Sequence, residues 1–178
     1  MTSSDSDNST GKAPERRDGS DPNPLTIANK LPNQDPLYRN NAPSYLQQLS
    51  SRPNAGVDNY YVSDRRAGKG SVVYVVDTGL DPSVDTFEAV QYISSPTLDI
   101  EDYFGQGSNV AALAVGLTKG VAPEAHLVSI KIFASDSVYT YTVSDYVLKV
   151  LWALMDITEK HLEDRAVISL ALRKYIYS

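Results

Sequence analysis

Cysteine is absent from this chain of 178 residues. A disulfide framework and a thiolate metal site are therefore excluded. Long apolar runs are also missing, because no stretch approaches the roughly 20 residues that a membrane-spanning helix needs. The opening residues, MTSSDSDNST, contain no apolar core of the kind found in signal peptides. We expect a soluble chain without an export address and assign it no compartment.

Clusters of basic residues are scarce as well. The chain has 16 lysine and arginine residues against 22 aspartate and glutamate residues, and its formal net charge is −6. No run of lysine and arginine exceeds two residues. A phosphate backbone would meet few positive charges, so we expect neither nucleic acid nor a membrane as a partner.

Apolar side chains are unevenly distributed along the chain. Residues 1–24 contain no valine, isoleucine, leucine or aromatic residue, and such a segment cannot offset the entropy that is lost on ordering. We therefore predict a disordered polar tail over residues 1–24. Residues 25–58 carry scattered apolar positions broken by prolines, which favours an extended arm. The folded domain is predicted to span residues 59–178.

Apolar runs alternate with helical patterns in this predicted domain. Short apolar runs predict strands at Val72–Val76, Val90–Ile93, Leu127–Phe133 and Val167–Leu172. Strand and helix in alternation predict an α/β fold with a mostly parallel sheet and flanking helices. In such sheets functional sites gather at the carboxyl ends of the strands.

Two helices are predicted between these strands. The small residues that follow Gly107 are typical of a helix packed closely on a sheet. A second helix is preceded by Thr142, with Asp145 three residues later, which together form the pattern of an N-terminal cap. Its apolar residues recur at helical spacing, at Val143, Val147, Leu151 and Leu154.

The first predicted strand ends on an acid, Asp77, in the sequence VVYVVDTGLD. A carboxylate at the end of a buried strand needs a partner nearby. Asp-Thr-Gly also begins the active loop of aspartic proteases, where two such carboxylates share a proton. Only one copy occurs here, and the surrounding pattern is α/β rather than all-β. Taken alone, the motif indicates a turn cap more often than a catalytic group.

Three segments between Tyr60 and Leu172 resemble the subtilases, the subtilisin-like serine proteases. AGKGSVVYVVDTGLD resembles the segment with the family's catalytic aspartate, GVAPEAHLVSIKIF its Gly-Val-Ala-Pro motif and the strand after it, and DRAVISLAL the strand that lines its substrate groove. The resemblance implies a partial subtilisin-like three-layer fold, with catalytic groups in the order Asp, His, Ser and with Asp77 at the aspartate position. We expect no cofactor and no metal ion.

The chain departs from the family at the histidine position. Subtilases carry Gly-His-Gly-Thr-His-Val-Ala, whereas this chain reads GQGSNVA, so Gln106 stands at the position of the general base. A carboxamide does not titrate near neutral pH and cannot accept the serine proton. The two histidines, His126 and His161, are predicted to be structural or surface residues. We therefore expect Gln106 to be non-functional as a base and Asp77 to be vestigial.

A second departure concerns the end of the matched region. Only six residues follow the predicted groove strand, so the family's oxyanion asparagine and nucleophilic serine have no counterpart, and we expect a truncated domain. The groove strand is represented by Ser169, Leu170, Ala171 and Leu172. The family's Ser-Leu-Gly is matched by Ala171, Leu172 and Arg173, and an arginine there would obstruct pairing with a peptide backbone.

The loss of the histidine leaves Asp77 without the ring that satisfies it in the family. The Gln106 side chain retains N–H donors. We therefore predict that Gln106 or Asn109 donates a hydrogen bond to the Asp77 carboxylate.

Two functions from different classes follow. The first is an inactive pseudoprotease that acts as an interaction module. The second is a fragment of a serine-type endopeptidase that needs a missing carboxyl-terminal half or a partner chain to hydrolyse peptide bonds. Because Val167–Leu172 contains neither charge nor proline, we expect an open sheet edge there that pairs with another protein or with this chain itself.

Overall fold

The computed structural model describes residues 36–51, 59–93, 99–132 and 142–171. The chain divides into two compact units, residues 1–65 and residues 66–178. The predicted tail over residues 1–24 lies outside the described residues. Within the described part of the chain, no helix is both long enough and apolar enough to cross a membrane.

The first unit contains a small antiparallel sheet and one short helix. Its elements are β1 (Pro36–Asn40), α2 (Ser44–Ser50) and β2 (Tyr60–Asp64). Leu46 of α2 is fully buried and packs with Ala42 and Tyr61. The sequence predicted an extended arm over residues 25–58, whereas the described part of that segment folds, because Leu46 gives it a small core shared with β2.

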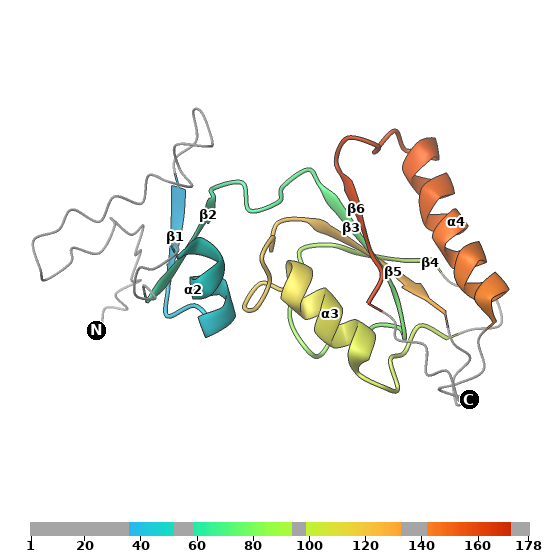
Figure 1. Ribbon diagram of the computed structural model, residues 1–178, viewed down its shortest axis with the longest axis horizontal. Helices are drawn as coiled ribbons and strands as arrows, with labels where there is room; N and C mark the ends of the chain where they lie inside the picture. Colours follow the sequence, from blue (N-terminus) through green and yellow to red (C-terminus); the bar gives the residue numbers. More distant parts are fainter. Residues whose placement is uncertain (1–35, 52–58, 94–98, 133–141, 172–178) are drawn as a thin grey trace, which may run out of the picture. The chain divides into compact units, whose positions relative to one another are not determined.

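The second unit is a four-stranded parallel sheet between two helices (Figure 1). Its elements are β3 (Val72–Asp77), β4 (Val90–Ile93), α3 (Gln106–Val115), β5 (His126–Lys131), α4 (Val143–Glu159) and β6 (Ala166–Ser169). The order across the sheet is β4-β5-β3-β6, so β3 is central and β6 lies at one edge. The predicted α/β fold class and parallel sheet are confirmed.

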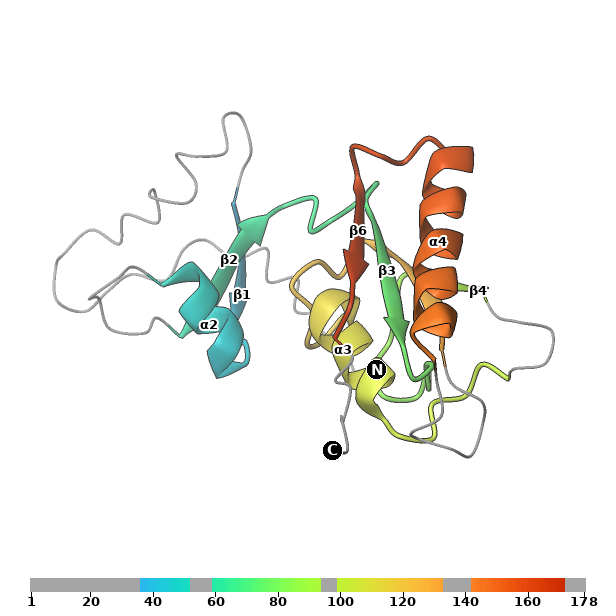
Figure 2. The same ribbon diagram turned by 45° about the vertical axis from the view of Figure 1, so that its right-hand side comes forward.

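The two helices cover opposite faces of the sheet (Figure 2). Successive residues of a strand point to opposite faces, so β3 contributes to two cores. Tyr74 packs with Ala153 in the core on the α4 side, and Val75 packs with Val115 in the core on the α3 side. A strand that is covered on both faces requires a continuous apolar run, which explains the sequence of β3.

Helix α4 begins with the predicted capping box. The Asp145 backbone N–H donates to Thr142 Oγ1 at 3.1 Å, and the Thr142 backbone N–H donates to Asp145 Oδ2 at 2.9 Å. The face of α4 that packs on the sheet contains Ala153 and Ile157. It is not the face that carries the apolar series, whose side chains are 46–61% exposed: Val143, Val147, Leu151 and Leu154.

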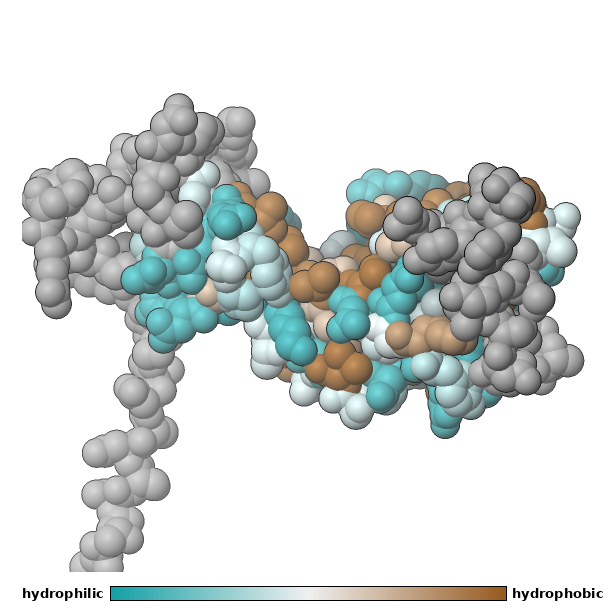
Figure 3. Space-filling model, turned by 60° about the horizontal axis from the view of Figure 1, so that its bottom comes forward, coloured by the Kyte–Doolittle hydropathy of each residue, from teal (hydrophilic) through white to brown (hydrophobic). Residues whose placement is uncertain are grey.

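Apolar side chains also reach the surface in the region of α3. Figure 3 shows them as brown atoms interspersed with teal, polar residues on that side of the second unit. Leu113 is 47% exposed, and Leu117, just after the helix, is 39% exposed. The surface around α3 is therefore mixed in polarity.

Candidate functional site

The carboxyl ends of β3 and β5 lie side by side at the carboxyl-terminal end of the parallel sheet. Asp77, the last residue of β3, is opposite Lys131, the last residue of β5. Both side chains are buried, Asp77 with 1% and Lys131 with 3% of its surface exposed. Two buried groups of opposite charge thus lie next to each other at the carboxyl ends of the strands, where the sequence predicts the site.

The Asp77 carboxylate is only partly satisfied. Its Oδ1 atom accepts the backbone N–H of Thr78 at 2.8 Å. Its Oδ2 atom is buried and has no hydrogen-bond partner among the described residues. Burial raises the pKa of Asp77, while the Thr78 N–H and the nearby Gln106 side chain act in the opposite direction.

Gln106 is the first residue of α3, and its side chain is bound elsewhere. Its Nε2 atom donates to the backbone carbonyl of Ala171 at 3.0 Å. The prediction that Gln106 or Asn109 donates to Asp77 is supported only in part: hydrogen bonding by the Gln106 side chain acts to lower the pKa of Asp77, while its Nε2 atom is bound to a carbonyl beyond the end of β6. Asn109 is exposed. A backbone carbonyl past the last paired residue needs a donor, and the amide supplies it.

Two glycines allow α3 to begin against the end of β3. A Cβ atom at Gly107 would lie 2.3 Å from the carbonyl oxygen of Gly79 and 3.2 Å from Asp77 Cβ. Gly79 itself has φ +126°, and a Cβ there would meet the Glu101 carbonyl at 2.6 Å. No other residue type fits these contacts without a backbone shift, so the glycines on both sides of the contact fix the position of Gln106 relative to Asp77.

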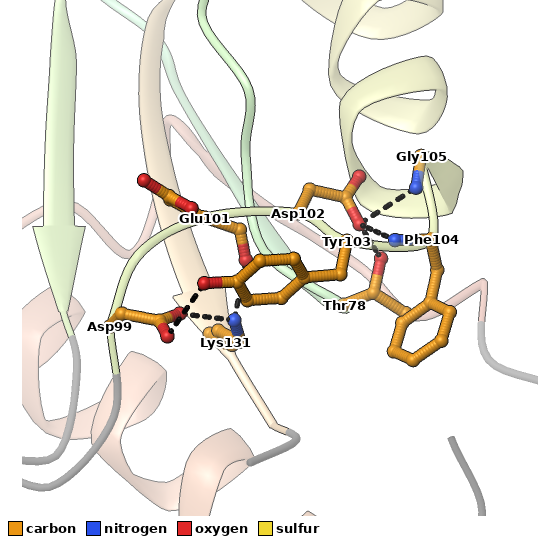
Figure 4. A network of polar contacts seen from close by, with 8 residues as sticks. All are labelled: Thr78, Asp99, Glu101, Asp102, Tyr103, Phe104, Gly105 and Lys131. Atoms are coloured by element: carbon orange, nitrogen blue, oxygen red, sulfur yellow. Dashed lines mark hydrogen bonds and ion pairs between the residues drawn. The ribbon is translucent and has the colours of Figure 1, made fainter. Parts of the chain in front are cut away.

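Asp102 holds this arrangement together (Figure 4). Its Oδ1 atom accepts hydrogen bonds from Thr78 Oγ1 at 2.7 Å and from the Gly105 N–H at 2.9 Å. Its Oδ2 atom accepts the N–H and hydroxyl of Ser108 at 2.8 and 2.6 Å. The Gly107 N–H donates to Thr78 Oγ1 at 2.9 Å. The turn after β3 and the start of α3 are thus joined through one carboxylate.

The electrostatics of Asp102 are opposite to those of Asp77. Burial acts to raise the pKa of Asp102, but the hydrogen bonds from Ser108 and Thr78 outweigh it, and the pKa is lowered. Sequence reasoning missed this residue. Its signal was an acid just before a glycine-flanked helix start, with a serine inside the first turn.

Lys131 is neutralised by the segment that precedes α3 rather than by Asp77. Its Nζ atom lies 2.5 Å from Asp99 Oδ1, donates to the Glu101 carbonyl, and sits 4.8 Å from the centre of the Tyr103 ring (Figure 4). The hydrogen bond from Lys131 lowers the pKa of Asp99. Asp77 therefore lacks a hydrogen-bonded cation although a lysine is its neighbour in the sheet.

Known proteins similar to this chain are subtilisin-like proteases. The chain is 34% identical over 135 residues, 74% of its length, to subtilisin-like proteinase Mp1 of Magnaporthiopsis poae. It is 32% identical over 139 residues, 76% of its length, to subtilisin-like serine protease Pen ch 13 of Penicillium rubens. Subtilisin-like protease 2 of Trichophyton rubrum is 34% identical over 116 residues, 63% of the chain.

The same relationship holds at the level of the fold. The crystal structure of a cold-adapted subtilisin-like serine proteinase matches 74% of this chain with a TM-score of 0.53 and 21% identity. This chain contains part of a subtilisin-like domain. No protein-family profile matches it. The chain spans 33%, 34% and 27% of the three relatives and 46% of the solved proteinase chain.

The predicted groove strand of the subtilisin-like domain corresponds to β6 and the residues after it. Ser169 is the last residue of β6, and Leu170 and Ala171 follow as exposed residues. Leu172 and the arginine after it lie outside the described residues. The hydrogen bond from Gln106 to Ala171 brings the histidine position and the groove strand of the pattern together at one edge of the sheet.

Neither histidine of the chain lies near Asp77 at the carboxyl end of β3. His126 begins β5 and pairs with Val72, at the amino end of the sheet, about 16 Å from Asp77 along the strand direction. His161 follows α4 and is exposed. No imidazole is therefore available to the carboxylate, as the sequence predicted.

Metal binding has no support in the part of the domain that the structure describes. Among these residues, no group of three or more histidine, cysteine, aspartate or glutamate side chains is placed to hold an ion. The expectation that the chain uses no metal and no cofactor stays a prediction.

Proposed function

We propose that this subtilisin-like domain does not hydrolyse peptide bonds by itself and acts as a pseudoprotease that binds other polypeptides. Its homology to serine proteases is shown by the comparisons. The loss of hydrolysis rests on one observation, the carboxamide of Gln106 at the position where the family pattern has its general base. A group that cannot accept a proton near neutral pH cannot activate a serine hydroxyl, whatever its geometry.

The surroundings of Gln106 support this proposal. The amide donates to Ala171 O and serves as a structural link between α3 and the segment after β6. Asp77, which would orient a histidine in an active relative, is buried with Oδ2 unpartnered among the described residues and has a raised pKa. A carboxyl group in this state has no catalytic partner to orient or stabilise.

The proposed interaction role rests on the edge of the sheet. β6 pairs with β3 on one side, and no described strand pairs with its other side. Val167 is 59% exposed and Leu170 is 47% exposed. An apolar edge strand without charge or proline favours the addition of a strand from another chain, so the segment Val167–Leu172 is the proposed contact with a polypeptide partner.

A second candidate function has an observation of its own. The chain spans about a third of the relatives that it matches. It would then contribute this third of a serine-type endopeptidase, with the nucleophile supplied by the carboxyl-terminal part of such a domain or by a partner chain. Gln106 weighs against this candidate, because the base would still be missing.

The two candidates differ in a labelling experiment. A fluorophosphonate probe, which reacts with activated serines, should label neither the purified chain nor proteins that co-purify with it if the first candidate is correct. A labelled co-purifying chain would favour the second. A subtilisin-like relative with the family histidine is the positive control.

The substitution Gln106→His separates loss of the base from loss of the nucleophile. We expect hydrolysis of a chromogenic peptide to stay at the buffer background, because histidine supplies a base and no nucleophile. Reproducible turnover of the unmodified chain that Asp77→Ala abolishes would show that the domain is an active protease.

A further inference from the structure

Helix α4 is apolar around most of its circumference. Ala153 and Ile157 are buried against the sheet. On the outward side, six large apolar residues with 46–67% of their surface exposed form what we call the α4 stripe: Val143, Val147, Leu148, Leu151, Leu154 and Met155. A helix with a second apolar face, beyond the one that packs on its own sheet, is normally covered on that face as well. The stripe is therefore a candidate interaction surface.

No residue of the stripe is charged, and the exposed Glu159 lies at its carboxyl-terminal end, one turn after Met155. At 3.6 residues per turn, Asp145, Lys149 and Asp156 of α4 project away from it. Each of these charges also has a partner within the chain: Asp145 caps the helix, Lys149 lies 3.6 Å from the centre of the Trp152 ring, and Asp156 pairs with Lys160 at 2.8 Å. All three charges are paired within the chain, so none of them is free to attract a charged partner.

We propose that two copies of this chain associate through the α4 stripe, with the two helices antiparallel about a two-fold axis. A two-fold contact requires a surface that is complementary to itself, and a neutral apolar row on a straight helix meets that requirement. Each copy carries a formal net charge of −6, so two copies repel each other. An uncharged surface adds no local repulsion to this.

The size of the stripe fits such a pair. Six side chains that are about half exposed present on the order of 500 Å² per copy, so a pair buries on the order of 1,000 Å², near the lower limit of specific interfaces. A contact of this size gives a reversible dimer rather than a permanent one. The proposal concerns α4 alone and holds whether or not the domain hydrolyses peptides.

Sedimentation equilibrium of the full chain tests the proposal. We expect a monomer–dimer equilibrium in the micromolar range that tightens as salt is added, because salt screens the repulsion between the two acidic copies. Leu151→Lys places a charge in the middle of the stripe and should weaken the dimer by about tenfold or more. Leu113→Lys is the matched control, since Leu113 on α3 is also a leucine that is 47% exposed. It should leave the equilibrium unchanged.

The absence of cysteine allows a second test that does not depend on a destabilising charge. In an antiparallel pair, two Leu151 residues lie near the two-fold axis, whereas two Val143 residues lie at opposite ends. A short bismaleimide should therefore link Leu151→Cys into a covalent dimer and leave Val143→Cys monomeric.

Three results would overturn the proposal. The first is a chain that stays monomeric at high micromolar concentration and high salt. The second is an association that Val167→Lys on β6 dissociates while Leu151→Lys does not, which would place the contact at the sheet edge. The third is an association that weakens with salt, which would indicate a charged interface.

Discussion

Replacement of Asp77 by asparagine removes a negative charge from a carboxylate that is 1% exposed. The asparagine oxygen can still accept the Thr78 N–H, which Oδ1 accepts at 2.8 Å. Oδ2, which has no donor among the described residues, is replaced by a neutral group. A buried polar atom without a partner costs about 1–3 kcal/mol, and a charged one costs more. We expect the variant to raise the free energy of unfolding at pH 7 by about 1 kcal/mol, or the melting temperature by about 4 °C.

The gain depends on pH because burial raises the pKa of Asp77 in the folded chain. The folded state then holds the proton more tightly than the unfolded state, so the natural chain loses stability as the pH rises from the unfolded pKa through the folded pKa. Below the unfolded pKa, Asp77 is neutral in both states. Thermal unfolding followed by circular dichroism from pH 3 to pH 8 should show melting temperatures that coincide in acid and separate toward neutrality.

Destabilisation by Asp77→Asn at neutral pH that shrinks in acid would refute this reasoning. It would mean that the carboxylate is well satisfied in the folded chain and that the Gln106 amide is its donor. The double variant with Gln106→Ala decides this, because a real hydrogen bond between the two side chains would make their effects non-additive.

Three further substitutions test other parts of the domain. Asp102→Asn should lower the free energy of unfolding by about 2 kcal/mol at pH 7, because its donors lose a charged acceptor; the loss should shrink in urea denaturation at pH 3, since the pKa of Asp102 is lowered and acid removes its contribution in the natural chain too. Gly107→Ala should cost about 2 kcal/mol or more, because its Cβ would lie 2.3 Å from the Gly79 carbonyl; an unchanged urea midpoint would contradict the close approach of α3. Thr142→Ala should cost about 1 kcal/mol in the same assay and Thr142→Ser much less, because serine retains the cap.

The fold of the second unit could be predicted from its apolar runs. β3 and β4 lie where the sequence predicted them, because strands covered on both faces must be continuously apolar. The mostly parallel sheet that the alternation of strands and helices predicted is also confirmed. Helical spacing predicted α4 but did not indicate which face packs on the sheet, since a helix that is apolar on several sides leaves that choice to tertiary contacts.

The candidate site could be predicted from the sequence only in part. Asp77 could be placed because a strand end is a local feature of the sequence. The donor to Ala171 and the partners of Asp102 could not, because they depend on segments that meet only in the folded sheet. Gln106 was assigned to the carboxylate because it stands at the position of the histidine that satisfies this acid in the family and retains N–H donors. In the structure its Nε2 atom donates to a carbonyl that sequence spacing does not bring near.

The pairing of β3 with β6 has a consequence for the order in which the domain forms. Val72 lies opposite Ala166, so this ladder closes a loop of more than 90 residues, whereas the contacts of Asp102 join segments within about 30 residues of each other. During synthesis, the turn after β3 and the start of α3 can lock together first, while one side of the central strand is still unpaired. The link from Gln106 to Ala171 forms only after residue 171 has left the ribosome. We expect this last step to be slow and to be the stage at which the nascent chain is most prone to aggregation.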